Sequence, residues 1–331
     1  MRRRALNRTD RRVNIALRVL CLGAGLLLFV ALAAIVEQVI VGAGPAINRF
    51  GLGFLTRSSD WNPPAQGATT AESYGAPLYM YGTVVTSLLS LIFSTVLGVS
   101  IGLFLAIVAP RRVTLGGRWR VSPAGLIGPL VELLAAMPSV VLGLIGVLVI
   151  LPFFHSTVDP VIHAVLGWIP IFAKTYTAGN SLFAASAVLT IMIVPIIAAL
   201  SRDLFSAVPQ ELRDGAEALG ATRWEMIRGV VLPVTRSGVT AACMLGLGRA
   251  VGEAIAVEQV VGGQNQGVIH ASLFLGGNTL ASMIAANDPA TPVTKLEGAS
   301  LYYLALILLV FVVVTILAAR WIAGDFKAKF R

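Results

Sequence analysis

Six long apolar segments constrain this chain more than any other feature of its sequence. A helix needs about 20 mostly apolar residues to cross about 30 Å of hydrocarbon. Six segments meet this requirement, and their limits lie near residues 15–40, 81–109, 126–151, 181–200, 237–261 and 300–323. The pattern predicts an all-α polytopic membrane protein with six transmembrane helices.

The composition agrees with this prediction and excludes two other classes of protein. Hydrophobic residues make up 56% of the 331 residues and charged residues only 12%, whereas an ordinary soluble domain has about 25% charged residues. Neither a soluble globular protein nor a disordered chain fits such numbers. The net charge of +9 would suggest nucleic-acid binding in a soluble protein. Here the basic loops of a membrane protein explain it, so we expect no nucleic-acid partner.

The first apolar segment is preceded by Arg2, Arg3 and Arg4, as a secretory signal peptide would be. Residues 19–36 are, however, 18 consecutive uncharged residues, which is longer than the apolar region of about 7–15 residues in a signal peptide. The sequence therefore favours a retained first transmembrane helix over residues 15–40.

The distribution of Lys and Arg predicts which side of the membrane each loop faces. Basic residues are concentrated in cytoplasmic loops of membrane proteins. One side would hold twenty of the 25 Lys and Arg residues, in residues 1–18, 110–125, 202–236 and 320–331, and the opposite loops hold four. We therefore expect both termini, residues 1–14 and 324–331, in the cytoplasm. The long loops 41–80, 152–180 and 262–299 would then face outside, and the short apolar run 160–171 would lie along the membrane face.

No catalytic or metal-binding group is expected in this chain. His155, His163 and His270 are scattered, and Cys21 and Cys243 both lie in apolar runs. None of the four lysines follows a glycine, so the ATP-binding pattern GxxxxGK[ST] does not occur. If ATP and Mg²⁺ are used, we expect them on another chain.

The loop 202–236 predicts a helical hairpin. Residues 210–219 form the first short helix, and Gly220 suits the left-handed conformation that ends a helix. Thr222 and Glu225 have the spacing of a capping box, in which each side chain accepts a hydrogen bond from the other residue's amide. Residues 224–231 form the second helix, which Pro233 is expected to end. From these residues alone, the hairpin could equally pack on its own helix bundle.

The hairpin resembles the EAA loop of ABC importer permeases. The run from Asp214 to Pro233 is DGAEALGATRWEMIRGVVLP, and its glycine and its Leu-Pro end fall at the spacing of that loop. It departs from the pattern where Asp-Gly-Ala stands for Glu-Ala-Ala, and Gly215 weakens the helix by up to about 1 kcal/mol. The resemblance implies docking to an ATPase subunit through Asp214, Gly215, Ala216, Glu217, Gly220, Ala221, Thr222, Trp224 and Glu225.

Arg249 is the most unusual residue of the predicted spans, because it lies near the middle of residues 237–261. A central Arg costs about 2.5–3.5 kcal/mol on insertion scales, so such residues usually line a polar pathway and have a partner. Glu253, four residues on, would share its helix face and pair with it, either as a structural pair or as part of a substrate route. Glu258 and Gln259 would line the same route. A fixed cation favours an anionic substrate.

Two further runs resemble the phosphate ABC importer permeases of PstC type. Residues 244–257 read MLGLGRAVGEAIAV, and residues 132–141 read ELLAAMPSVV. The resemblance covers about residues 81–323 and implies the type I importer permease fold in a bacterial cytoplasmic (inner) membrane. It also implies a PstA-like second permease, two PstB-like ATPases and a PstS-like binding protein that delivers phosphate. Glu258 departs from the pattern, where an apolar residue is expected.

The sequence therefore predicts a permease subunit that moves inorganic phosphate by alternating access. The alternatives are a permease for molybdate or sulfate, an ion-coupled secondary transporter without an ATPase, and a membrane scaffold that transports nothing. Two residues of the third span keep open roles. Glu132 is expected at the membrane interface, and Pro138 is expected to kink its helix, either to shape the pathway or to fit neighbouring helices.

Overall fold

The computed structural model describes residues 8–56, 61–62, 72–109, 113–115, 119–121, 123–172, 179–263, 269, 272–287, 292 and 294–328. Within these residues six helical stretches are long and apolar enough to cross a membrane, which confirms the predicted number of spans. The helices longer than twenty residues are α1 (Arg8–Phe50), α2 (Pro77–Leu103), α7 (Leu182–Ser206), α10 (Leu232–Gly252) and α13 (Lys295–Ala328). The described strands are β1 (Val113–Leu115) and β2 (Trp119–Val121), which pair antiparallel.

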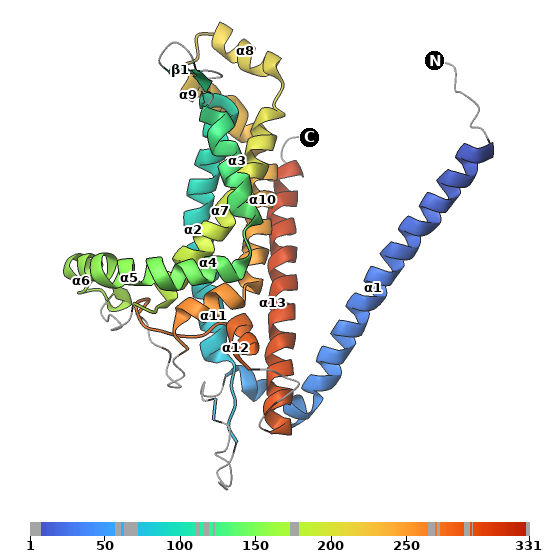
Figure 1. The fold of residues 1–331 in the computed structure, drawn as a ribbon, viewed down its shortest axis with the longest axis vertical. Helices are drawn as coiled ribbons and strands as arrows, with labels where there is room; N and C mark the ends of the chain where they lie inside the picture. The colour runs from blue at the N-terminus through green and yellow to red at the C-terminus, as the bar shows by residue number, and fades with distance from the viewer. Residues whose placement is uncertain are drawn as a thin grey trace.

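The centre of the molecule is the pair α2 and α7, which run side by side along their lengths (Figure 1). Glycines let the two backbones come close. A Cβ atom at Gly98 would lie 2.8 Å from the Cβ atom of Ile197, and one at Gly102 would lie 2.8 Å from that of Ser201. The buried serine and threonine hydroxyls on α2 donate to carbonyls of the same helix, as where Ser90 donates to the carbonyl of Ser87 at 3.0 Å. Both helices continue without a break through this contact.

The third span, predicted as one helix over residues 126–151, is instead broken at Pro138. Helix α3 (Pro123–Ala136) stops just before this residue. Pro138 itself is not helical, with φ −59° and ψ 138°, and α4 (Ser139–Ile145) begins directly after it. Proline disfavours the helical conformation in the residue before it, so the chain turns. The helical run then continues sideways, across the upright helices (Figure 1). Its members after α4 are η3 (Gly146–Ile150), α5 (Leu151–Phe153), η4 (Phe154–Val158) and α6 (Asp159–Leu166).

The fifth span, predicted over residues 237–261, is also broken. Helix α10 ends at Gly252, Glu253 is extended with φ −76° and ψ 117°, and α11 (Ile255–Val261) begins two residues later. The second halves of the two broken spans pack on each other. A Cβ atom at Gly143 of α4 would lie 2.9 Å from the Cα atom of Ala256 of α11, so the two half-helices are in close contact.

Helix α1 stands apart from the bundle for most of its 43 residues (Figure 1). None of its most apolar stretch is buried. Its contact with the rest of the chain is at its C-terminal end, where a Cβ atom at Gly42 would lie 2.7 Å from the ring of Tyr302 on α13. The following 3₁₀ turn, η1 (Gly51–Leu55), places Phe54 in a stack with Tyr303, with ring centroids 4.6 Å apart.

A polar and aromatic cluster joins the segment that follows α1 to the start of α13. Trp61 Nε1 donates to Glu297 Oε1 at 3.3 Å, and the hydroxyls of Tyr74 and Thr294 donate to Glu72 Oε2 at 3.3 and 2.9 Å. Burial raises the pKa of Tyr74 to about 12, so its phenol stays a donor even at a pH at which an ordinary tyrosine has lost its proton. Among the described contacts within this chain, α1 is therefore held at its C-terminal end.

The remaining helical segments are η2 (Phe104–Val108), η5 (Pro170–Phe172), α8 (Gln210–Ala218), α9 (Arg223–Met226), η6 (Ile227–Val231) and α12 (Leu280–Ala286).

Candidate functional site

Arg249 lies in the last turn of α10, just before the break in the fifth span, and its side chain is exposed. The same helix face carries two glycines and a leucine. A Cβ atom at Gly248 or Gly252 would meet nothing within 4 Å, and Leu245 is 60% exposed. The arginine therefore sits on an open face of this chain, at the point where a span is interrupted.

Glu253 does not pair with Arg249, so the predicted ion pair is wrong. The described residues contain no ion pair of Arg249 within 4.0 Å. Instead, Oε1 of Glu253 accepts a hydrogen bond from the amide of Ala256, at 3.4 Å. The spacing of four residues implied a common face only if the helix continued, and α10 ends at Gly252. Glu253 thus lies at the N-terminal end of α11, where a carboxylate is favoured by the helix dipole.

Glu258 and Gln259 follow on α11, half-buried. Oε2 of Glu258 and Oε1 of Gln259 are buried without a hydrogen-bond partner within the described structure. Gln259 lies against α4, since its Oε1 would be 2.4 Å from a Cβ atom at Gly143. Buried acceptors without partners are uncommon and mark places where water, a ligand or another chain completes the structure. Arg249, Glu253 and Glu258, the three residues predicted for the substrate pathway, therefore lie on either side of one break in the fifth span. The predicted ion pair between Arg249 and Glu253 does not form.

The described residues include no group of three or more His, Cys, Asp or Glu side chains that could hold a metal ion. What this region offers chemically is one exposed guanidinium group without a carboxylate partner within 4.0 Å. A guanidinium group presents a planar set of donors that matches the oxygens of a carboxylate or phosphate. The site can therefore bind an oxyanion, and a carboxylate from outside this chain could bind in the same way.

The helical hairpin forms as predicted at its turn. Gly220 has φ +86°, a conformation that side chains other than glycine rarely adopt. The capping box is present, because Thr222 Oγ1 accepts from the amide of Glu225 at 3.3 Å while Glu225 Oε2 accepts from the amide of Thr222 at 2.8 Å. The prediction that Pro233 ends the second helix is wrong. Pro233 lies in the first turn of α10, and the π-helical segment η6 before it carries the helix through.

The base of the hairpin is packed onto the end of α7. Phe205, Met226 and Ile227 are buried together in one apolar cluster, and the guanidinium of Arg213 on α8 donates to the carbonyl of Phe205. The hairpin and the last turn of α7 are therefore one rigid unit, at the end of the molecule where α1 begins and α13 ends (Figure 1).

The tip of the hairpin is open and partly apolar. Of the nine residues predicted to dock, Ala216 and Ala221 are half-buried and the others are exposed. Leu219 is 91% exposed and Trp224 62%. Leu219 and the exposed Leu212 were not among the predicted docking residues. Their signal in the sequence was a leucine pair seven residues apart on a short helix otherwise rich in polar residues.

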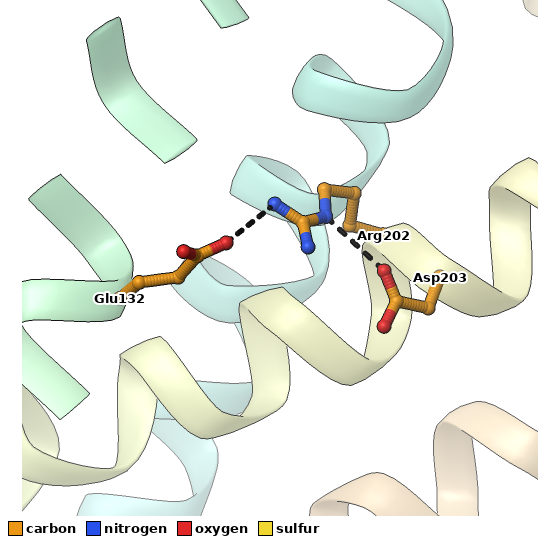
Figure 2. A network of polar contacts seen from close by, with 3 residues as sticks. All are labelled: Glu132, Arg202 and Asp203. Atoms are coloured by element: carbon orange, nitrogen blue, oxygen red, sulfur yellow. Dashed lines mark hydrogen bonds and ion pairs between the residues drawn. The ribbon is translucent and has the colours of Figure 1, made fainter. Parts of the chain in front are cut away.

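A further interhelical contact was not predicted. Arg202 on α7 forms an ion pair with Glu132 on α3, Nη1 to Oε1 at 3.2 Å, and a second one with Asp203, Nε to Oδ1 at 3.2 Å (Figure 2). Glu132 was expected only at the membrane interface. Its partner is 70 residues away in the sequence, and helical periodicity carries no information about such a pair.

Comparison with known proteins gives concordant matches. Residues 115–327 match the family described as "Binding-protein-dependent transport system inner membrane component". The phosphate transport system permease protein PstC of Pasteurella multocida is 36% identical over 91% of this chain and 88% of its own length. The PstC protein of Haemophilus influenzae is 36% identical over 89% and 88%. The probable ABC transporter permease protein YqgH of Bacillus subtilis is 31% identical over 94% and 88%.

Two solved structures share the fold at low sequence identity. A chain of a bacterial alginate ABC transporter superposes with a TM-score of 0.57 at 14% identity, covering 95% of this chain and 97% of that one. A chain of the MetNI methionine ABC transporter, in an inward-facing conformation, has a TM-score of 0.52 at 18% identity, covering 74% and 93%. These likenesses concern the fold alone.

Proposed function

The chain belongs to the family of binding-protein-dependent transport system inner membrane components, and on that premise we propose that it is the permease subunit of an ABC importer that carries inorganic phosphate into the cytoplasm. It is a multi-pass protein of the cell inner membrane and a non-catalytic subunit of an ABC transporter. Phosphate is the substrate in the names of the PstC relatives, which match over most of this chain.

The observation that carries the proposal is Arg249 on its open helix face. An arginine in an apolar span normally faces a water-filled cavity or another protein chain rather than lipid. No carboxylate lies within 4.0 Å of Arg249 among the described residues, so the guanidinium is available for a bidentate contact to an oxyanion. Substrate would then be bound beside the break in the fifth span, with Glu253 and Glu258 nearby.

The open face implies a second permease subunit. The glycines beside Arg249 leave room for close approach of another helix, and such small-residue faces are typical of helix contacts in membranes. We assign the covering partner to a PstA-like permease. The pathway would form between the two permeases, and this chain alone would supply one half of it.

The partner at the other end would be the ATPase. The rigidly attached hairpin presents Leu219 and Trp224 to solvent, and exposed apolar and aromatic side chains of this kind make good anchors in a docking groove. Two PstB-like ATPases would bind ATP and Mg²⁺ and push the hairpins of the two permeases, which alternates access by rigid-body movement. A PstS-like binding protein would deliver phosphate from outside.

The direction of import requires both termini in the cytoplasm, which the distribution of Lys and Arg favours. Single cysteines in place of Gly116 and Ala65, which both lie outside the described residues, test this orientation. The Gly116 cysteine should react with a membrane-impermeant reagent only from the cytoplasmic side, and the Ala65 cysteine only from the outside. Labelling of both from one side would contradict the topology.

The substrate is tested with the purified complex of the two permeases, the ATPases and the binding protein in proteoliposomes. Inorganic phosphate should stimulate ATP hydrolysis and should accumulate, whereas molybdate and sulfate should do neither. Stimulation by molybdate or sulfate instead of phosphate would favour the other oxyanion importers. Uptake driven by an ion gradient without ATP would favour a secondary transporter.

A further inference from the structure

The ion pair between Arg202 and Glu132 has a geometry that suits reversible contact. Arg202 lies near the end of α7 and bridges two carboxylates, Glu132 on α3 and Asp203 on its own helix, both at 3.2 Å (Figure 2). The side chains of Arg202 and Glu132 are 31% and 60% exposed. The guanidinium also lies beside Gly128, one turn before Glu132, since a Cβ atom there would be in ordinary van der Waals contact with Nη1, at 3.5 Å. One face of α3 thus receives the arginine.

Helix α3 is otherwise weakly attached. It packs mainly on α7 and on η2, and the large apolar side chains Leu126, Leu130 and Leu133 are exposed. Its C-terminal end is the break at Pro138. A helix with few contacts and a break at one end is the kind of element that moves as a unit.

On one side, the pair connects to the hairpin. Arg202 is three residues before Phe205, which is buried against the hairpin and whose carbonyl accepts from Arg213. The end of α7 and the hairpin therefore move together, and Arg202 moves with them.

On the other side, the pair connects to the candidate substrate site. Beyond Pro138, α4 packs against α11 through Gly143, beside Ala256 and Gln259. Helix α11 begins directly after the break that follows Arg249. A displacement of α3 and α4 would therefore reach the residues around Arg249 through contiguous contacts.

We propose that Arg202 and Glu132 form a latch that is made and broken during transport, with Asp203 as the partner that keeps Arg202 paired when α3 leaves. An exposed ion pair adds little stability, which suits a contact that must open in every cycle. The second carboxylate lowers the cost of opening further, because the guanidinium is never left alone. The latch would couple the hairpin to the broken third span. This inference rests on the proposed function only in that an ATPase moves the hairpin.

The test measures the separation of α3 and α7 directly. Spin labels at Leu126→Cys and Ser206→Cys, in a Cys21→Ser and Cys243→Ala background, report the distance in the assembled complex with and without ATP. Glu132→Gln should raise the ratio of separated to closed α3 by about 1.5- to 5-fold, as expected for loss of one exposed pair. Glu132→Arg should raise it more. The double variant Glu132→Arg with Arg202→Glu should restore the closed population.

Asp203→Asn is the matched control, because it removes the alternative partner and leaves the pair intact. It should shift the ratio the other way, toward closed α3. Loss of the latch should also lower the ratio of phosphate-stimulated to basal ATP hydrolysis, and the double variant should recover it. Unchanged distances and unchanged stimulation in the Glu132 variants, at normal yield of complex, would overturn the latch, as would a double variant no better than either single one.

The two proposals fail in different ways. A wild-type complex that phosphate does not stimulate would contradict the proposed substrate, and the distance measurement would still decide the latch. If phosphate stimulates ATP hydrolysis by the complex but the Glu132 variants do not change the separation of α3 and α7, the proposed substrate stands and the latch is rejected.

Discussion

The pair α2 and α7 differs from the pair of broken spans in the continuity of its helices. In α2 and α7 the helices are continuous, and glycines bring their backbones together, so that a Cβ atom at Gly102 would lie 2.9 Å from the carbonyl oxygen of Ala198. In the broken spans the chain turns at Pro138 and at Glu253. There the glycines beside Arg249 face open space.

The difference distinguishes a rigid contact between two helices from interrupted helices that can change conformation. A close contact between backbones has one good arrangement, because interiors packed at this density do not deform continuously. An interrupted helix has local conformational freedom at the break and leaves polar groups for other partners. The one exposed arginine of the apolar part of α10 lies beside such a break. The close contact of α2 with α7 therefore favours one rigid arrangement, and Arg249 lies on a broken span.

The largest expected effect is a loss of stability, caused by a substitution at the contact between α2 and α7. Gly102→Val would place its side chain against the carbonyl oxygen of Ala198 and the amide nitrogen of Arg202, both 2.9 Å from the added Cβ atom. Backbone atoms cannot move aside cheaply, so we expect a loss of roughly 1–3 kcal/mol or more and little folded protein in a thermal melt in detergent. Gly248→Val is the matched control, and it should melt like the wild type because that position is open. Equal melting of the two variants would contradict the comparison.

The second prediction removes the charge from the broken span. Arg249→Ala should abolish phosphate uptake while yield, melting temperature and basal ATP hydrolysis stay near those of the wild type, because the side chain makes no ion pair with the residues that the structure describes. Arg249→Lys should also be impaired, since an ammonium group does not offer the planar fork of a guanidinium. Phosphate uptake, measured together with the yield of assembled complex for each variant, tests this prediction. Wild-type uptake by Arg249→Ala would remove this residue from the pathway.

The third prediction concerns the helical hairpin. Gly220→Val should cost about 1–2 kcal/mol of local strain, because Gly220 has φ +86° and a β-branched residue resists that conformation. We expect normal insertion and weaker binding of the ATPase, measured by co-purification. Gly220→Asn is the control, since asparagine tolerates positive φ and the position has open space around it. Equal ATPase binding by both variants would show that the turn geometry is unimportant.

The smallest expected effect is a change in melting temperature, caused by substitutions of Glu253 at the break between α10 and α11. Glu253→Gln keeps an oxygen that can accept from the amide of Ala256, so melting should change little, whereas Glu253→Leu loses that cap at a cost of roughly 0.5–2 kcal/mol. Thermal melts of both variants measure the difference. A marked destabilisation by Glu253→Gln would instead point to a charge pair with Arg249, which the described structure does not contain.

The sequence allowed much of the fold to be predicted, because span number and hairpin capping depend on local pattern. The apolar runs are long, and Gly220, Thr222 and Glu225 have their roles within a few residues of each other. Pro138 signalled a disturbance, though not that the chain would turn sideways. The second break had no proline to mark it, so Glu253 was assigned a helical position that it does not occupy.

Contacts between distant segments were beyond a single sequence. The ion pair of Glu132 and Arg202 depends on how α3 lies on α7, and no periodicity encodes that arrangement. The same limit applies to the exposure of Leu219, which only the position of the hairpin reveals. Local signals thus predicted elements, and packing decided which of their residues meet.

The open face around Arg249 also bears on how the cell would handle this protein before assembly. A newly inserted copy carries a cation on an apolar helix face that nothing in its own described structure neutralises. A charged side chain facing lipid is costly, so we expect a copy whose open face is uncovered to be less stable in the membrane than an assembled one. Its lifetime should then depend on how closely its synthesis is matched to that of the partner, and surplus copies should be degraded first.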